Sequence, residues 1–242
     1  MDQAICIGAQ PGHAARIDFK PLRIEPVELP PEWTFVVANT LVRAEKSAGA
    51  MKAYNDRTRE SDAALSRVRV RLDERPTTGY PQLLSRHDVI ELFTLAGQTL
   101  DPVLLRRFRH VVTEGVRVRR AVTAMREGDL ALFGSLMDAS HESLRKDYEV
   151  SCKELDDMVE RARAGGAVGA RLTGAGFGGC IVALCESGDE DAVIGSLDDY
   201  YAARGVGMER PLAFAGREKA VPLKEARFAV RPSAGATWKE VG

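Results

Sequence analysis

A glycine-rich segment in the last third of the chain is the feature whose residue types and spacing point most directly to chemistry. Residues 174–179 read GAGFGG, so four of six positions are glycine: Gly174, Gly176, Gly178 and Gly179. Glycine lets the backbone adopt positive φ and lets a ligand or another chain approach closely, and successive amides in such a loop can bind an anion. G-K-S/T is missing, and a strand rather than a helix is expected to follow, so neither a P-loop nor a dinucleotide fingerprint is present. The spacing fits an anion-binding loop and a tight β-hairpin with a glycine bulge equally well.

The composition limits the partners of such a loop. The chain has 242 residues, 45% hydrophobic and 29% charged, with a formal net charge of −1. This length supports one large domain or two small ones. A nucleic-acid partner would require a basic excess or a basic face, so none is expected. No run approaches the ~18 apolar residues of a membrane span, and no basic segment leads an apolar one at the N-terminus, so neither a membrane partner nor a signal peptide is expected.

The four cysteines indicate reduced thiols. Cys6, Cys152, Cys180 and Cys185 are too few and too scattered for a disulfide scaffold, and none forms a C-x-x-C pair. No metal site is therefore predicted, and the pattern favours a cytoplasmic protein.

The first third of the chain predicts two strands and a long helix. Residues 13–19 (HAARIDF) and 33–39 (WTFVVAN) are typical of strands, and prolines at positions 21, 26, 30 and 31 interrupt the chain between them. Residues 43–72 have a helical and strongly charged pattern, which a turn at 76–79 (PTTG) ends.

The middle of the chain predicts three helices. The first has one apolar face (Leu104, Leu105, Phe108, Val111, Val112, Gly115), with Asp101 as N-cap and Pro102 in the first turn. Residues 128–129 (GD) separate it from a second helix that carries Leu132, Phe133, Leu136, Met137 and Leu144. The third is expected to start near Ser151, which has capping-box spacing with Glu154, and to end at residues 165–166 (GG).

The last third returns to a β pattern around the glycine segment. Residues 168–173 and 180–185 are predicted strands, residues 191–203 a helix, and residues 226–230 a last strand. Strands and helices do not alternate regularly. This favours an α+β fold, with helices packed on a mostly antiparallel sheet, over a doubly wound fold.

Several charged and histidine residues receive structural interpretations. His110 and His141 lie on amphipathic helices and are expected to be structural hydrogen-bonding residues. The acidic pairs at 156–157 and 198–199 are expected to be solvated on exposed helix faces. Arg117, Arg119 and Arg120 are expected to form a solvated or salt-bridged face.

The residues around the glycine segment resemble a known family. Residues 168–173 (VGARLT), followed by GAGFGGC and IVAL, resemble the third conserved motif of the GHMP kinases in its galactokinase form. In that family the loop lies beside the phosphates and supports the nucleotide loop and the sugar pocket. The resemblance therefore implies that Gly174, Gly176, Gly178 and Gly179 support the phosphate site through backbone geometry.

Other segments match the same family in the same order. They are residues 1–3 (MDQ), 12–18 (GHAARID), 109–114 (RHVVTE), 140–150 (SHESLRKDYEV, with Lys146 in place of an acid) and 232–236 (PSAGA). Residues 205–225 match poorly and resemble an insertion. The ordered matches cover nearly the whole chain.

The resemblance assigns two further site residues. It implies that Asp2 is the carboxylate that accepts a proton from the C1 hydroxyl of galactose. Taken alone, an acid after Met1 would be a solvated terminal residue, and the adjoining Gln3 favours the catalytic interpretation. Tyr54 resembles the tyrosine of a Y-N-x-R-R segment that contacts the sugar, although Ala53 replaces an acid and Thr58 the second arginine. The alternative for Tyr54 is ordinary helix packing.

The resemblance also implies an architecture and cofactors. Residues 31–242 would form the ferredoxin-like C-terminal domain of a GHMP kinase, and residues 1–30 a remnant of the N-terminal domain with apolar surface uncovered. ATP and Mg²⁺ are the implied cofactors and a sugar the implied substrate. The family's G-R-V-N-L-I-G-E-H-x-D-Y and P-x-x-x-G-L-S-S-S-A motifs, which precede M-D-Q, are not in this sequence. We therefore expect part of a longer enzyme, inactive alone, with the Mg²⁺ ligands in the missing segment.

Three functions follow from the resemblance. The favoured one is transfer of the ATP γ-phosphate to the C1 hydroxyl of D-galactose. The alternatives are another GHMP sugar kinase, acting on N-acetylgalactosamine, arabinose or a uronic acid, and a non-catalytic galactokinase-like sugar sensor with a protein partner.

Overall fold

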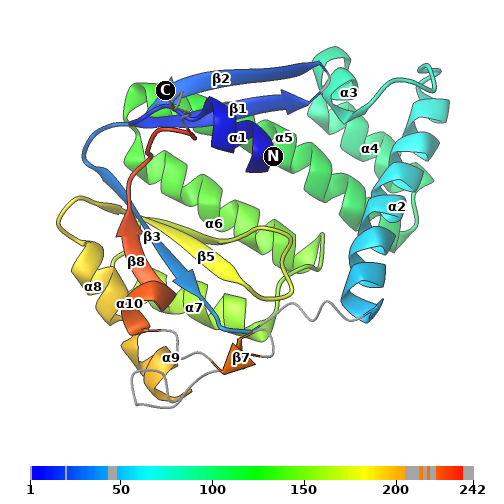
Figure 1. Cartoon of the computed structure of the whole chain (residues 1–242). Coiled ribbons are helices and arrows are strands. Elements are labelled where there is room, and N and C mark those ends of the chain that lie inside the picture. The colour runs from blue at the N-terminus through cyan, green and yellow to red at the C-terminus, as the bar shows by residue number, and fades with distance from the viewer. Residues whose placement is uncertain are drawn as a thin grey trace, which may run out of the picture.

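The fold is α+β, with antiparallel sheets and packed helices (Figure 1). The computed structural model describes residues 2–19, 21–42, 48–204, 213–214, 217–218 and 222–236. Within these residues a four-stranded sheet has the order β4-β5-β3-β8, and two further sheets have two strands each. Every strand pair is antiparallel, which confirms the predicted fold class.

The four-stranded sheet provides the main core. Its strands are β3 (Trp33–Asn39), β4 (Gly169–Thr173), β5 (Cys180–Glu186) and β8 (Arg227–Val230). Side chains alternate between its two faces. Val36, Ala38, Ile181 and Ala183 are fully buried on one face, which α7 (Lys153–Ala164), α8 (Glu190–Gly195) and α9 (Asp198–Ala202) cover.

The opposite face packs on two long helices and a hairpin. The helices are α5 (Pro102–Glu127) and α6 (Leu130–Lys146), and the hairpin is β1 (His13–Phe19) with β2 (Leu22–Glu28). Trp33, Val122, Met137 and Leu184 are buried there, and the rings of Trp33 and Phe133 lie 5.1 Å apart.

A separate helical core lies beside the N-terminal half of α5. It is built by α2 (Ala48–Arg71), α3 (Tyr80–Arg86) and α4 (Val89–Thr99). Val68, Leu83, Leu92, Phe108 and Val112 are fully buried in it. This core fixes α2 against α5, and α2 carries one of the candidate site residues.

The amino-terminal part carries exposed apolar side chains. Helix α1 (Asp2–Gly8) and the β1–β2 hairpin expose Ile7 by 79%, Phe19 by 58% and Leu22 by 60%, in line with the uncovered apolar surface expected there. The segment 232–236 runs back along this part, where Gly235 N donates to Ala9 O (3.0 Å). The proposed domain boundary after residue 30 stays a prediction.

Most predicted elements are confirmed. Strands 13–19 and 33–39 have the predicted bounds, α2, α5, α6 and α7 occupy the predicted regions, and Asp101 caps α5 by accepting from Val103 N and Leu104 N. The predicted last strand is β8, after a short helix, α10 (Leu223–Ala226). The predicted insertion at 205–225 falls mainly outside the described residues, apart from β6 (Ala213–Phe214), β7 (Arg217–Glu218) and residues 222–225.

Three local predictions are wrong. The segment with the prolines contains β2. Pro26 is tolerated there because, among the described strands, β2 pairs with β1 alone, and a proline is compatible with an edge strand. The helix predicted over 191–203 is two helices, since the Ser196 hydroxyl donates to Val193 O (2.7 Å) at the break. Ser151 does not cap α7: its hydroxyl donates to Asp156 Oδ1 (2.5 Å), and Cys152 is the N-cap.

Candidate functional site

The glycine loop at 174–179 joins the adjacent antiparallel strands β4 and β5, as predicted. Its glycines have φ values of +80° (Gly174), +85° (Gly176), +131° (Gly178) and +86° (Gly179), and Phe177 has +58°. An L-residue in the left-handed region is strained by about 1–2 kcal/mol. The run of positive φ therefore explains why glycine occupies four of these positions.

Backbone contacts from two other segments anchor the glycine loop. Phe177 N donates to Val150 O (2.5 Å), and Gly179 N donates to Val42 O (3.0 Å). Gly179 O accepts from the amide (2.8 Å) and the hydroxyl (2.9 Å) of Thr40. A Cβ on Gly176 would lie 2.1 Å from Val150 O. The loop is thus fixed by segments far away in sequence.

The loop also keeps unused donors. Within the described part of the chain, the amides of Ala175, Gly176 and Gly178 have no hydrogen-bond acceptor. Free backbone amides in a glycine-rich loop are donors that an anion can use. The loop is therefore a hairpin connection that also carries free donors, and its role at phosphates stays a prediction.

Helix α6 holds the edge strand that leads into the loop. Asp138 Oδ1 accepts from Ala170 N (2.8 Å), and His141 Nδ1 accepts from Leu172 N (3.3 Å). His141 Nε2 lies 3.2 Å from Asp156 Oδ1 on α7, and burial lowers the pKa of His141. His141 thus has the structural role expected for it. The prediction that Asp156 is simply solvated is wrong, because it also accepts from the Ser151 hydroxyl.

His110 is the second histidine with a structural role. Its Nδ1 lies 3.0 Å from the Ser143 hydroxyl, and its ring stacks on Tyr148 at 4.4 Å. Burial lowers its pKa to about 4. At neutral pH His110 is therefore an uncharged bridge between α5 and the end of α6.

Tyr54 and Asp2 lie on elements other than the glycine loop. Tyr54 is 44% exposed on α2, and the Thr58 hydroxyl donates to its backbone oxygen (3.4 Å). Asp2 is the first residue of α1, which lies against the β1–β2 hairpin (Figure 1). Its side chain is outside the described part of the structure. The described residues show no direct hydrogen bond that joins any two of these three features.

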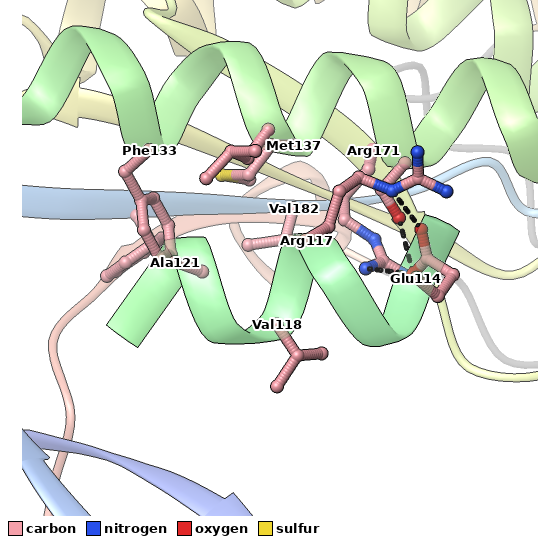
Figure 2. A pocket seen from close by; sticks show the side chains of 11 residues that line it. Glu114, Arg117, Val118, Ala121, Phe133, Met137, Arg171 and Val182 are labelled. Atoms are coloured by element: carbon pink, nitrogen blue, oxygen red, sulfur yellow. Dashed lines mark hydrogen bonds and ion pairs between the residues drawn. The ribbon is translucent and has the colours of Figure 1, made fainter. Parts of the chain in front are cut away.

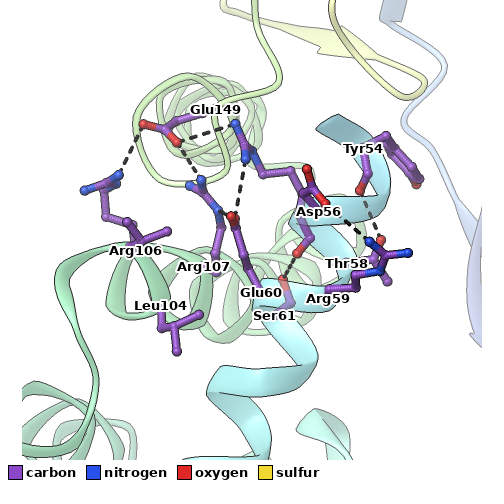
Figure 3. A network of polar contacts seen from close by, with 12 residues as sticks. Tyr54, Asp56, Thr58, Arg59, Glu60, Ser61, Leu104, Arg106, Arg107 and Glu149 are labelled. Carbon is purple, nitrogen blue, oxygen red and sulfur yellow. Dashed lines mark hydrogen bonds and ion pairs between the residues drawn. The ribbon is translucent and has the colours of Figure 1, made fainter. Parts of the chain in front are cut away.

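A network of charged side chains lies between α2, α5 and the segment after α6 (Figure 3). Arg107, whose side chain is only 1% exposed, donates to Glu60 Oε2 (2.7 Å), Asp147 O (2.5 Å) and Glu149 Oε2 (2.5 Å). Sequence reasoning missed this network. The available signal was a charged residue at 107, three positions after Leu104 and directly before Phe108 on the apolar face of a helix.

A pocket of about 210 Å³ lies away from the candidate site residues, between α5, α6 and the sheet (Figure 2). Phe133, Met137 and Val182 line its apolar part, and Glu114 pairs with Arg117 at its polar end (2.5 Å). This pair agrees with the salt-bridged face expected for Arg117. None of the predicted site residues lines this pocket.

Other classes of site were sought in the described residues. No group of three or more His, Cys, Asp or Glu side chains there could hold a metal ion, and the four cysteines are free thiols, with Cys185 buried. No helix in the described ranges is long and apolar enough to cross a membrane.

Comparison with known proteins places this geometry in a family. Residues 121–203 match the model "GHMP kinases C terminal". The chain is 40% identical to a galactokinase of Roseiflexus sp. over 188 residues and 39% identical to one of Chloroflexus aurantiacus over 213 residues. The crystal structure of Lactococcus lactis galactokinase complexed with galactose matches 96% of the chain with a TM-score of 0.64 and 32% identity. Residues 121–203 are therefore similar to the C-terminal region of the GHMP kinases, and these three relatives are galactokinases.

The match covers only part of each relative. The aligned residues are 77% of this chain and 45% of the Roseiflexus protein, and 88% and 52% for the Chloroflexus protein. The chain also covers 53% of the Lactococcus lactis protein. It thus spans about half the length of the relatives that it matches.

Proposed function

We propose that this chain is part of a sugar kinase that transfers the γ-phosphate of ATP to the C1 hydroxyl of D-galactose. The observation that carries the proposal is its 36–40% identity to three galactokinases over 77–88% of its length. The relative of known structure was crystallised with galactose, and its match extends over almost the whole of this chain.

In this proposal the glycine loop serves the phosphates of ATP. The unpaired amides of Ala175, Gly176 and Gly178 fit an anionic ligand, because preorganised donors stabilise the charge that develops on a transferring phosphoryl group. Bound Mg²⁺ would neutralise phosphate charge, and we propose that its ligands lie outside these 242 residues.

Two side chains are proposed to act on the sugar. Asp2 accepts the proton of the C1 hydroxyl as that oxygen attacks the γ-phosphorus, because a carboxylate in hydrogen-bond reach of the nucleophile is the usual general base. Tyr54 contacts the sugar from α2, where its exposed position leaves it free for a ligand. We further propose that the enzyme acts in the cytoplasm and that residues 1–242 alone are inactive.

The test is a chimeric protein in which the uncovered amino-terminal part of the Roseiflexus galactokinase precedes residues 1–242. A coupled ADP-release assay with galactose is expected to show turnover by the chimera and none by the 242-residue chain. Asp2→Asn in the chimera should lower kcat roughly 10²–10⁴-fold with little change in KM, since it keeps the shape and removes the proton acceptor.

The intact Roseiflexus enzyme and a circular-dichroism melt of each protein are the controls. Turnover only with N-acetylgalactosamine, arabinose or a uronic acid would show that the substrate is that sugar and not galactose. A folded chimera without turnover on any sugar would favour the non-catalytic sensor. Full activity of Asp2→Asn would remove Asp2 from the mechanism.

A further inference from the structure

A hydrogen bond joins the glycine loop to the segment after α6, and there is a strained residue on each side of this bond. Glu149 has φ +56° and Phe177 has φ +58°, and neither is a glycine. Phe177 N donates to Val150 O, the carbonyl that directly follows Glu149 (2.5 Å). Left-handed residues other than glycine persist only where surrounding contacts hold them. The contacts that hold Glu149 therefore also set the position of the loop's acceptor.

Arg107 supplies those contacts from α5. Its planar guanidinium donates to Glu149 Oε2 (2.5 Å) and Asp147 O (2.5 Å), and so holds the segment 147–149 at two points. Arg106 and Arg57 approach the same carboxylate at 3.3 and 3.7 Å. Burial raises the pKa of Glu149, but the hydrogen bond from Arg107 and the three arginine charges outweigh it and lower the pKa. Glu149 is therefore held as a carboxylate.

The same arginine reaches the helix that carries Tyr54. Arg107 Nε donates to Glu60 Oε2 of α2 (2.7 Å), six residues after Tyr54. Figure 3 shows Glu60 and Arg107 facing each other between α2 and α5, with Glu149 above them. Arg57, which also lies on α2, approaches Glu149 Oε2 at 3.7 Å. The segment 147–150 thus contacts α2 on one side and the glycine loop on the other.

We propose that Arg107 and Glu149 are a positioning pair that fixes the glycine loop relative to α2 during phosphoryl transfer. The pair touches neither substrate and acts through Val150 and Glu60. The inference rests on the proposed function for its catalytic consequence, and its geometric part is independent of that function. A misplacement of about 1 Å in an active site can cost about 10²-fold in rate. Because Val150 O is the acceptor that anchors the loop at Phe177, the loop is sensitive to this pair.

Amide hydrogen exchange of the 242-residue chain tests the geometric part. Arg107→Lys keeps the charge but has a single nitrogen in place of the three that each reach a different acceptor. Glu149→Gln keeps the shape but removes the carboxylate. Each should accelerate exchange of the Phe177 amide at least 10-fold, while the amide of Ala183 in β5 changes less than 2-fold. Arg109→Lys is the matched control, because Arg109 lies on the same helix and reaches Asp147 through an exposed pair (3.4 Å); no local change is expected. Uniform acceleration across the chain, or none at Phe177, would show that the pair only stabilises the fold.

Kinetics of the chimera test the catalytic part. Arg107→Lys should lower kcat about 10–100-fold with KM for ATP and galactose within about 3-fold, and Arg109→Lys should match the parent. Faster exchange of the Phe177 amide without a fall in kcat would show that the position of the loop is not coupled to catalysis. An inactive but folded parent chimera would instead refute the proposed function. The exchange experiment would then test by itself whether Arg107 and Glu149 position the loop.

Discussion

The glycine loop and helix α2 carry two of the candidate features, and they are held in different ways. The loop is fixed by backbone conformation and by backbone hydrogen bonds to Val42 and Val150. Helix α2 is fixed by a buried apolar face and by side-chain pairs such as Arg107–Glu60. Backbone constraints leave a trace in the sequence as glycines. Side-chain pairs between distant helices leave only scattered charges.

This difference predicts that the loop is the less tolerant of the two regions. Gly176→Val places a β-branched side chain at φ +85° and 2.1 Å from Val150 O. Left-handed strain and overpacking together are expected to lower the free energy of unfolding by roughly 2–5 kcal/mol. Urea denaturation of the 242-residue chain, followed by circular dichroism, measures this change. In the chimera the same variant should abolish turnover.

Gly174→Ala is the control that separates strain from crowding. Gly174 has nearly the same φ (+80°), but nothing lies within 4 Å of an added Cβ. Alanine there should lower the free energy of unfolding by only about 1–2 kcal/mol. Equal losses at both positions would mean that contact with Val150 does not anchor the loop.

The same difference explains which parts of the structure could be predicted from the sequence alone. Period-two patterns and glycine turns predicted β3, β4, β5 and the loop between them, because these signals are local. Asp101 predicted the start of α5 for the same reason. The Arg107 network joins residues 40 or more positions apart, so no local pattern reveals it. The prediction missed β2 because Pro26 was read as an interruption. Whether a strand tolerates a proline depends on which strands pair with it, and the sequence does not show this.

The helices that side-chain pairs hold together, which include α2 and α5, should also be more sensitive to pH than the glycine loop. His110 stacks on Tyr148, and its pKa falls from 6.5 to about 4 on folding. Between those values the unfolded chain binds a proton that the folded chain does not, so stability falls as pH falls from about 6.5 to 4. A shift of this size corresponds to about 3 kcal/mol.

His110→Phe should remove this part of the pH dependence. At pH 7 the variant should be about 1 kcal/mol less stable, because the hydrogen bond with Ser143 is lost. As the pH falls, the wild type loses stability faster, and the two curves should cross between pH 4 and 6. Urea midpoints at several pH values give both curves. Parallel curves would show that His110 is protonated equally in the folded and unfolded chains.

The smallest effect on stability is expected at Tyr54, which tests whether α2 offers a side chain to a ligand. Tyr54 is 44% exposed, and its hydroxyl has no hydrogen bond to a described residue, so Tyr54→Phe should change the free energy of unfolding by less than about 0.5 kcal/mol. If the hydroxyl binds the sugar, loss of one hydrogen bond should raise KM for galactose roughly 3–10-fold in the chimera, with KM for ATP unchanged. Tyr80→Phe is the matched control, because the Tyr80 hydroxyl donates to Ser61 O of the same helix (2.8 Å). That variant should lose about 1 kcal/mol of stability and keep KM for galactose. An unchanged KM for galactose in Tyr54→Phe would leave Tyr54 as a surface residue of α2 and remove it from the sugar site.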